Sequence, residues 1–383
     1  MDGTLMQRPD QPAMLAALER LVATESPSSD KTRCDACADE IAKLFQQRLG
    51  VAAIRHRRPD AGDHLEIRIG EGSGPVVLLC HHDTVWPEGT LGRLPFHVQG
   101  DRVTGPGSYD MKAGIVEAAF ALEHARPRRP VVVLSTSDEE IGSASSRALI
   151  EETARQAVAV LVLEPAVTGG AIKTARKGIA DFVLEVHGRA AHAGVEPEKG
   201  VSAIEELAHQ VLALKGLARP ALGTTINVGV VGGGTRPNVV AAHARAEIDV
   251  RFARASEAER AVAAIQGLQP NLEGARLRIR GGIDRPPMER SPGVIRLAQL
   301  AQRLATDVGF TLSEMSTGGA SDGNFTAAMG VPTLDGLGPD GGGAHADSEH
   351  LLVESCLQLT QLLRLLIEAL LPSEQSLSQP AGD

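Results

Sequence analysis

The sequence predicts an α/β protein in which a layered domain with a mostly parallel sheet is interrupted by a second, smaller domain. Three observations predict this fold. Short runs that are apolar throughout alternate with helical segments up to about Gly178, strands of alternating polarity follow, and the first pattern resumes after Pro286-Pro287. An all-apolar strand is typical of a parallel sheet covered on both faces, and alternation is typical of a sheet with one open face. At 383 residues, the chain is long enough for about two domains.

The first part of the chain begins with two helices and continues as strands alternating with a further helix. We expect the helices at 11–25, 30–49 and 111–124, and the strands at 65–69, 75–80, 131–135 and 158–163. The run from Val76 to Leu79 is apolar at every position, so both faces of its sheet should be covered by helices. Strands that alternate with helices imply a layered sheet that is mostly parallel.

The middle of the chain reads as six elements in the order β-α-β-β-α-β. We expect the strands at 180–187, 224–231, 244–252 and 275–280, and the two helices to open at capping boxes, Ser202 to Glu205 and Ser256 to Glu259. This order is the ferredoxin-like arrangement.

The expected domain boundaries follow from these patterns. The larger domain is formed by 1–177 and 286–383, and the ferredoxin-like domain is an insertion over 178–285. After the insertion we expect helices at 293–308 and 351–371, and then a polar tail that is disordered.

Composition argues against several classes of partner and compartment. The formal net charge is −10, whereas nucleic-acid binding needs clustered Lys and Arg. No apolar run reaches the roughly 18–20 residues of a membrane span, and the N-terminal segment lacks the apolar stretch of a signal peptide. We therefore expect a cytoplasmic protein that binds neither nucleic acid nor membrane. Cys34 and Cys37 form a lone C-x-x-C in an expected helix and are most simply two free thiols.

Acids and histidines gather at five successive strand ends and loops. The groups are His81-His82-Asp83, Asp110, Asp138-Glu139-Glu140, Glu164 and His345. Ligand sites of open α/β sheets lie at the carboxyl ends of strands. A single acid or histidine at such a position is more often a solvated loop residue than a ligand, but five such groups together favour a ligand-binding site. Carboxylates and imidazoles without suitably placed thiolates suit a pair of zinc ions, and manganese or cobalt would fit as well.

Two features within these groups suggest a division of labour. Asp83 follows His81 by two residues on an extended chain, so it can share its face and hold the ring nitrogen that does not face a metal. The neighbours Glu139 and Glu140 point in different directions, so one can bind a metal while the other reaches the attacking water.

Nine stretches resemble one known family in its order along the chain. They are CHHDTV (80–85), GPGSYDMKAG (105–114), STSDEEIGS (135–143), LEP (163–165), GRAAHAG (188–194), RPNVV (236–240), IDVR (248–251), GGASDG (318–323) and GGAHADSEHL (342–351). The chain resembles the zinc-dependent family of glutamate carboxypeptidase, aminoacylase, acetylornithine deacetylase and succinyl-diaminopimelate desuccinylase. The likeness is greatest to the glutamate carboxypeptidase branch, from GPGSYDMKAG and AAHAGVEPEKGVSA.

The resemblance implies roles for individual residues. Five side chains would hold two zinc ions, with His81 and Glu164 on one, Glu140 and His345 on the other, and Asp110 shared by both. Asp83 would orient His81, and Glu139 would be the general base. The resemblance also implies a cis peptide bond between Asp110 and Met111.

On the substrate side, the resemblance implies a pocket for an α-carboxylate. Arg251 would bind that carboxylate with help from Arg176, and the turn around Gly318-Gly319 would line the pocket. The inserted domain would serve for dimerisation and as a lid. In a homodimer, His192 and Asn238 would complete the neighbouring protomer's site, with His192 stabilising the oxyanion.

The sequence therefore predicts a two-zinc metallohydrolase that cleaves an amide bond and releases an amino acid with a free α-carboxylate. A glutamate carboxypeptidase is the first interpretation, and an N-acyl-amino-acid deacylase with the same metal site is the second. A metal-free binding protein on this fold would have lost Glu139 or a ligand, and all of them are present. The sequence does not separate the first two.

Overall fold

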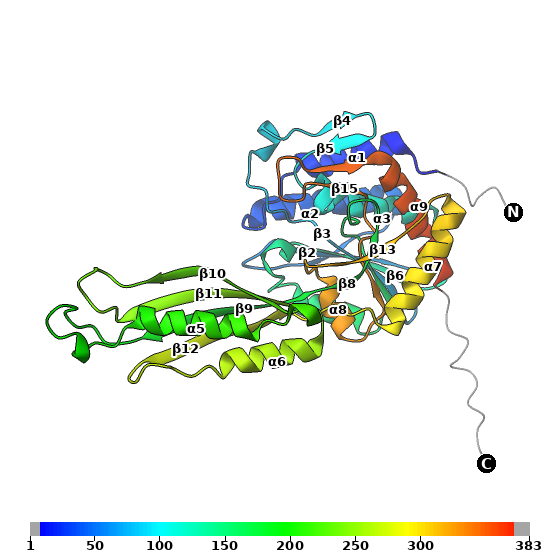
Figure 1. Ribbon diagram of the computed structural model, residues 1–383. Coiled ribbons are helices and arrows are strands. Elements are labelled where there is room, and N and C mark those ends of the chain that lie inside the picture. Colours follow the sequence, from blue (N-terminus) through cyan, green and yellow to red (C-terminus); the bar gives the residue numbers. More distant parts are fainter. Residues whose placement is uncertain (1–7, 371–383) are drawn as a thin grey trace, which may run out of the picture. The chain divides into compact units, whose positions relative to one another are not determined.

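The computed structural model describes residues 8–370, which divide into two compact units (Figure 1). The first unit comprises, among these residues, 8–174, Arg290–Ser316 and 321–370. The second comprises Ala175–Glu289 and the short segment Thr317–Ala320. The polar tail for which the sequence predicts disorder lies outside the described residues.

A mixed, mostly parallel sheet of six strands forms the centre of the first unit. Its order is β1 (Ile54–His56), β2 (His64–Ile69), β6 (Val131–Thr136), β3 (Val76–His81), β7 (Ala159–Val162) and β14 (Thr333–Leu334). The four strands from β6 to β14 run parallel, and β2 and β1 are antiparallel to their neighbours. Every residue of β3, β6 and β7 is buried, as the all-apolar runs predict.

Helices cover both faces of this sheet, and the alternation along β3 shows how. Val76 and Leu78 belong to one hydrophobic cluster, and Val77 and Leu79 to another. The first cluster contains α1 (Gln11–Ala23), α2 (Lys31–Leu49), α3 (Ala113–His124), α7 (Pro292–Val308) and α9 (Val353–Ala369), and the second contains α4 (Arg147–Ala154) and α8 (Gly323–Ala328). The layered architecture is therefore confirmed. Within residues 8–370, none of the helices combines the length and the apolar character that a membrane span requires.

Short elements complete this unit. A second, four-stranded sheet has the order β15 (Gly341–Gly342), β16 (His350–Leu352), β5 (Arg102–Thr104) and β4 (His97–Gln99), and β8 (Ile172–Arg176) pairs with β13 (Glu314–Thr317). Single turns of helix lie at η2 (Thr90–Gly92), η3 (Ser108–Lys112) and η4 (Glu139–Ile141), with η5 (Pro197–Lys199) and η6 (Pro220–Leu222) in the second unit. The final helix was expected from residue 351, but it begins at Val353 because residues 350–352 pair with β5.

The second unit is an antiparallel sheet with two helices on one face (Figure 1). The sheet order is β10 (Thr225–Gly233), β11 (His243–Phe252), β9 (Gly178–His187) and β12 (Arg276–Arg285), and the helices are α5 (Ala203–Leu217) and α6 (Ala255–Gln266). Ala180, Phe182, Leu184 and Val186 of β9 pack against the helices, as the alternating pattern predicts. This topology confirms the ferredoxin-like order.

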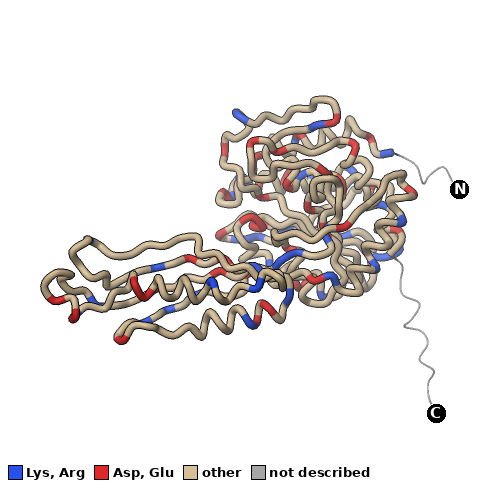
Figure 2. Tube along the Cα trace, in the orientation of Figure 1, with Lys and Arg blue, Asp and Glu red and all other residues tan. Residues whose placement is uncertain are grey.

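The open face of that sheet carries charged residues in pairs. Arg280 contacts Glu185 on the neighbouring strand, and Arg245 contacts Glu247 at 2.8 Å along the same strand. Figure 2 shows basic and acidic residues interspersed along this unit. The opposite charges therefore neutralise one another locally on this face.

The two predicted capping boxes had different outcomes. Ser202 is the N-cap of α5, and its side chain accepts a hydrogen bond from the Glu205 N–H at 3.2 Å, as predicted. The box at Ser256 was wrong, because α6 begins at Ala255 with Arg254 at the N-cap position and no side-chain cap. The carboxylate of Glu289 accepts the Ala255 N–H at 2.9 Å instead. A distant residue thus replaces the local cap.

Candidate metal centre

Three of the predicted groups meet at the carboxyl edge of the central sheet. His81 is the last residue of β3, Glu139 and Glu140 form the first residues of η4 after β6, and Glu164 follows β7. Because β6, β3 and β7 are parallel neighbours, their ends bring these side chains to one place.

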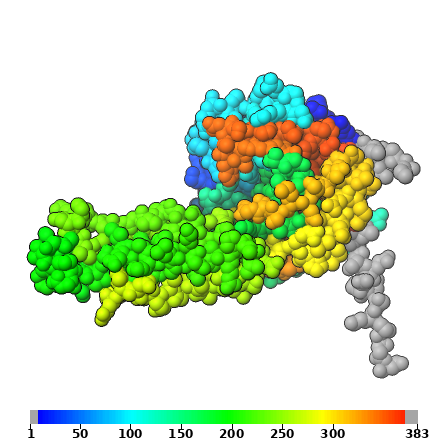
Figure 3. Space-filling view, viewed as in Figure 1, coloured from blue at the N-terminus to red at the C-terminus, as the bar shows by residue number. Residues whose placement is uncertain are grey.

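The other two groups come from outside that sheet, in the loops where the sequence places them. Asp110 lies in η3, just before α3, and His345 lies in the loop between β15 and β16. Figure 3 shows the orange segment that contains this loop at the surface of the first unit. Gly107 precedes η3 with φ 69°, and a Cβ there would meet the Thr84 methyl group at 2.5 Å, so glycine is required. The Asp110–Met111 peptide bond is cis, as the resemblance implies.

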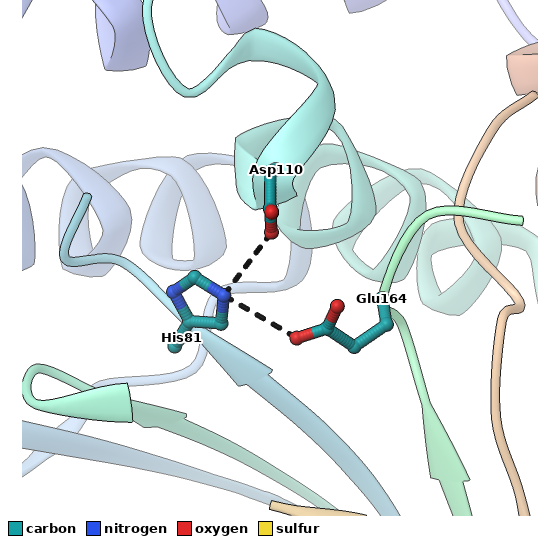
Figure 4. Close-up of side chains that lie close together, drawn as sticks. All are labelled: His81, Asp110 and Glu164. Carbon is teal, nitrogen blue, oxygen red and sulfur yellow. Dashed lines mark ion pairs between the residues drawn. The ribbon is translucent and has the colours of Figure 1, made fainter. Parts of the chain in front are cut away.

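Five side chains form two groups that could each hold a metal ion, and the groups share Asp110. In the first, the His81 Nε2 atom lies 3.4 Å from Asp110 Oδ1 and 3.4 Å from Glu164 Oε1 (Figure 4). In the second, the His345 Nε2 atom lies 3.4 Å from Asp110 Oδ2 and 3.2 Å from Glu140 Oε2. Asp110 therefore contributes one oxygen atom to each group.

These distances fit metal ligands better than hydrogen bonds. Charged N–H···O bonds are usually about 2.7–2.9 Å long. Tetrahedral zinc, with bonds of about 2.0–2.2 Å to N and O, separates its ligand atoms by roughly 3.3–3.5 Å. The His81 Nδ1 atom donates to the Asp83 carbonyl oxygen at 3.0 Å, so Nε2 is the ring atom left to bind a metal ion beside the two carboxylates. That Nε2 atom is buried and has no hydrogen-bond partner among the described residues.

The electrostatics of the site also favour a cation. Burial alone would lower the pKa of His81, but the carboxylates of Asp110, Asp83 and Glu164 raise it well above its usual value. Asp110 and Glu140 raise the pKa of His345 to about 10. Both imidazoles thus lie in a strongly negative field, which a bound cation would neutralise.

Asp83 connects the two sides of the centre. Its Oδ1 atom lies 3.4 Å from His81 Nδ1, and its carboxylate accepts the Ser28 hydroxyl at 2.8 Å. The same carboxylate accepts the backbone N–H groups of Glu139 and Glu140, each at 3.2 Å. Asp83 is therefore placed to fix the His81 ring, as predicted. It is also placed to fix η4, and the sequence did not suggest this second contact.

Two further carboxylates hold the loop around η4. Asp138 accepts the Ser145 N–H at 2.7 Å. Asp322 accepts the Thr136 hydroxyl at 3.2 Å and also that of Ser143. Asp322 lies in the GGASDG stretch, for which the resemblance implies a role only for the glycines, so the sequence did not predict this contact.

His82 and the C-x-x-C pair lie apart from both ligand groups. His82 is buried, contacts the Ser135 hydroxyl at 2.9 Å, and burial lowers its pKa to about 3, so it is neutral. Cys34 and Cys37 are buried free thiols in α2.

The remaining predicted residues all belong to the second unit. Arg176 is 4% exposed and donates to the carbonyl oxygens of Gly319 and Ala320, each at 3.2 Å. The Ala193 N–H donates to the Asn238 carbonyl oxygen at 3.0 Å, so the loops of His192 and Asn238 are neighbours, and both side chains are exposed. The structure thus brings Arg176 together with Gly319, and His192 together with Asn238.

Arg251 has a partner that the sequence did not predict. Its Nε atom donates to Asp249 Oδ1 at 3.0 Å, and its Nη2 atom contacts Oδ2 of the same carboxylate at 2.7 Å. This bidentate pair uses the part of the guanidinium that a substrate carboxylate would also use.

Comparison with known proteins identifies the family. The model of peptidase family M20/M25/M40 matches residues 77–369. Carboxypeptidase G2 of Pseudomonas is 32% identical over 350 residues, which cover 88% of this chain and 84% of that protein. Succinyl-diaminopimelate desuccinylase of Leptothrix cholodnii is 28% identical over 93% of this chain and 98% of that protein.

Solved structures show the same fold. The aminopeptidase PepT of Bacillus cereus matches with a TM-score of 0.80 at 24% identity, covering 94% of this chain and 98% of that one. An M20 family metallo-carboxypeptidase of Sulfolobus solfataricus matches with a TM-score of 0.69 at 17% identity, covering 96% and 99%. The family that the sequence motifs resemble is confirmed, and the chain belongs to peptidase family M20/M25/M40 as one of its metallohydrolases.

Proposed function

We propose that the protein hydrolyses an amide bond and releases an amino acid with a free α-carboxylate, with a C-terminal glutamate as the preferred product. The observation that carries the hydrolytic part is the pair of ligand groups that share Asp110. Similarity to carboxypeptidase G2 over most of both chains supports the choice of a carboxypeptidase reaction.

The metal ions in this proposal are two Zn²⁺, with Co²⁺ or Mn²⁺ as substitutes. His81, Glu164 and Asp110 would hold one ion, and Asp110, Glu140 and His345 the other. When bound, such a pair lowers the pKa of a water molecule and polarises the scissile carbonyl group.

Glu139 acts as the general base that takes a proton from the attacking water and passes it to the leaving amine. Two observations support this division between the neighbours. Among the described residues, the ligand groups include Glu140 and not Glu139. Asp83 accepts both backbone N–H groups, which fixes the turn from which the two side chains diverge.

The α-carboxylate of the substrate binds to Arg251. Arg176 and Gly319 shape the same pocket, in which Arg176 holds the turn through the Gly319 and Ala320 carbonyl groups. A bidentate guanidinium suits a carboxylate, and the substrate carboxylate displaces Asp249 from the guanidinium when it binds.

The insertion at 178–285, between the two parts of the catalytic domain at 1–177 and 286–383, serves as a lid and forms a homodimer. Its strand β10 lies at the edge of the sheet and exposes Val230 and Val231 at 54% and 59%. Helix α5 exposes Leu212 at 69%. An open sheet edge beside exposed apolar residues suits pairing with a second copy. In the dimer, His192 and Asn238 complete the neighbouring site, and His192 stabilises the oxyanion.

A deacylase of N-acyl amino acids is the second candidate. It would use the same metal groups, and the similarity to succinyl-diaminopimelate desuccinylase over nearly the whole of both chains favours it.

Chelation and a substrate panel test both parts of the proposal. Dialysis against a chelator should abolish amide hydrolysis, and Zn²⁺, Co²⁺ or Mn²⁺ should restore it. A dipeptide with C-terminal glutamate should then be cleaved faster than its α-amide, N-acetyl-ornithine or N-succinyl-diaminopimelate. Full activity of metal-free protein would refute the metallohydrolase mechanism, and preference for an acyl-ornithine or acyl-diaminopimelate would select the deacylase.

A further inference from the structure

Glu349 is a fully buried carboxylate behind the shared ligand Asp110. It lies in the loop between β15 and β16, and none of its surface is exposed. Four N–H groups point at its two oxygen atoms. Trp86 Nε1 and the Gly107 N–H contact Oε2 at 2.6 and 3.0 Å, and the N–H groups of Tyr109 and Asp110 contact Oε1 at 3.0 and 3.2 Å.

All four partners are donors, which makes the carboxylate a specific choice at this position. A carboxylate offers only acceptor atoms, so it can satisfy all four groups at once. A glutamine of the same shape would turn its NH₂ group toward one pair of donors and leave two N–H groups buried without an acceptor.

The contacts hold the backbone of Asp110, whose side chain lies near both imidazoles. The Asp110 N–H is held by Glu349, while its Oδ1 and Oδ2 atoms lie 3.4 Å from the Nε2 atoms of His81 and His345. A shift of the turn from Gly107 to Asp110 would therefore move both oxygen atoms relative to both imidazoles.

The same loop supplies a ligand and this support. Glu349 follows His345 by four residues, and its own N–H donates to the Ala346 carbonyl oxygen at 2.8 Å. The conformation of this one loop therefore determines the position of the His345 imidazole and that of the carboxylate that holds Asp110.

We propose that Glu349 is a positioning residue for the metal pair, which sets the place of the bridging Asp110 carboxylate for both ions. This inference rests on the proposed function, because it takes Asp110 as the shared ligand. It predicts that the binding of both ions depends on Glu349, although Glu349 is a member of neither ligand group and reaches Asp110 through its backbone N–H.

The experiment compares E349Q, W86F and E206Q by titrating metal-depleted full-length protein with Co²⁺ alone. Glu206 is a matched control in the inserted unit, since it is also fully buried and accepts the N–H groups of Asn271 and Leu272 at 2.9 and 2.7 Å. Visible absorption reports the Co²⁺ environment, and circular dichroism reports folding and thermal stability.

E349Q should weaken the binding of both Co²⁺ ions by about 10–100-fold and change the absorption bands, as supporting residues of metal sites do. E206Q should lower the melting temperature and leave Co²⁺ binding unchanged. Wild-type affinity and spectrum in E349Q would overturn the inference. If E349Q does not fold, W86F tests the inference instead, because it removes one of the four donors to Glu349. A several-fold loss of Co²⁺ affinity in W86F supports the inference, and unchanged Co²⁺ binding overturns it. Failure of the wild type to bind two Co²⁺ ions would overturn the proposed function as well.

Discussion

Glu139 and Glu140 have the same side chain and adjacent positions, yet their surroundings differ. Glu140 lies with His345 and Asp110 in a ligand group, whereas Glu139 belongs to neither group. The backbone N–H groups of both residues donate to the Asp83 carboxylate, so one residue fixes the turn in which both glutamates lie. The proposed difference in function therefore depends on the direction of each side chain from η4.

Exchange of each glutamate for glutamine separates the two roles. Glu139→Gln should keep two metal ions per protomer and lose roughly 10²–10⁴-fold in turnover, the usual contribution of a general base. Glu140→Gln should lose metal, because an amide is a poorer ligand than a carboxylate. Elemental analysis and kcat check both. Metal loss in Glu139→Gln alone would show that the two assignments are exchanged.

The Arg251–Asp249 pair yields a second prediction. If Asp249 competes with the substrate carboxylate, Asp249→Asn should lower KM for free-carboxylate substrates by up to roughly fivefold, since exposed ion pairs contribute about 0.2–1 kcal/mol. The value of kcat should change little, because the effect is on binding. Arg251→Ala should raise KM for the same substrates.

Glu247→Gln is the control for this measurement. Glu247 pairs with Arg245 two residues away on the same strand, at 2.8 Å, and Asp249 and Arg251 have the same spacing on that strand. A general effect of removing charge from this sheet would lower KM equally in both variants, and that result would remove Asp249 from the proposed role.

At the scale of elements, the residues that sequence reasoning missed share a physical cause. Periodicity predicted the all-apolar strands and the inserted domain, because burial on one or both faces leaves a local pattern. Glu349 and Asp322 leave none, since their burial results from segments distant in the chain. The sheet containing β15 and β16 was also missed, because its strands have two or three residues and its central pair, β5 and β16, joins residues about 250 positions apart.

The two serines at the predicted capping boxes differ in that Ser202 caps its helix and Ser256 does not, and substitution of each serine can measure this difference. Ser202→Ala should destabilise α5 by about 1 kcal/mol, because its side chain caps the Glu205 N–H. Ser256→Ala should change stability by no more than about 0.5 kcal/mol, since Ser256 is not the N-cap of α6. Hydrogen exchange of the first turn of each helix, together with urea unfolding, tests both. Equal losses would contradict the assignment of the caps.

At the scale of the whole molecule, the proposed dimer makes each active site depend on two chains. Each active site would then contain residues of both chains, because Glu139 would act within its own chain and His192 would act in the site of the partner chain. Two chains with different defects can then restore one site between them.

Complementation follows from that division. His192→Ala and Glu139→Gln should each be nearly inactive alone. After subunits exchange in an equal mixture, about half of the dimers are mixed and one of their two sites is whole, so roughly a quarter of wild-type activity should return. Activity of the exchanged mixture, with mixed dimers identified by two affinity tags, is the measurement.

The control mixture combines Glu139→Gln with Glu140→Gln. Both residues would act within their own chain, so no mixed dimer has a whole site and no activity should return. Recovery there, or none in the first mixture despite mixed dimers, would place His192 outside the neighbouring site.

The position of the loop between β15 and β16 has a consequence for how the protein is made. His345 and Glu349 leave the ribosome after every other residue of the proposed centre. A chain released before residue 345 would keep His81, Asp110 and Glu164, but it would lack one ligand of the second group and the support of Asp110. Since metal binding contributes to folding stability, firm retention of two ions would distinguish completed chains from interrupted ones. Metal content could therefore serve as a measure of finished synthesis.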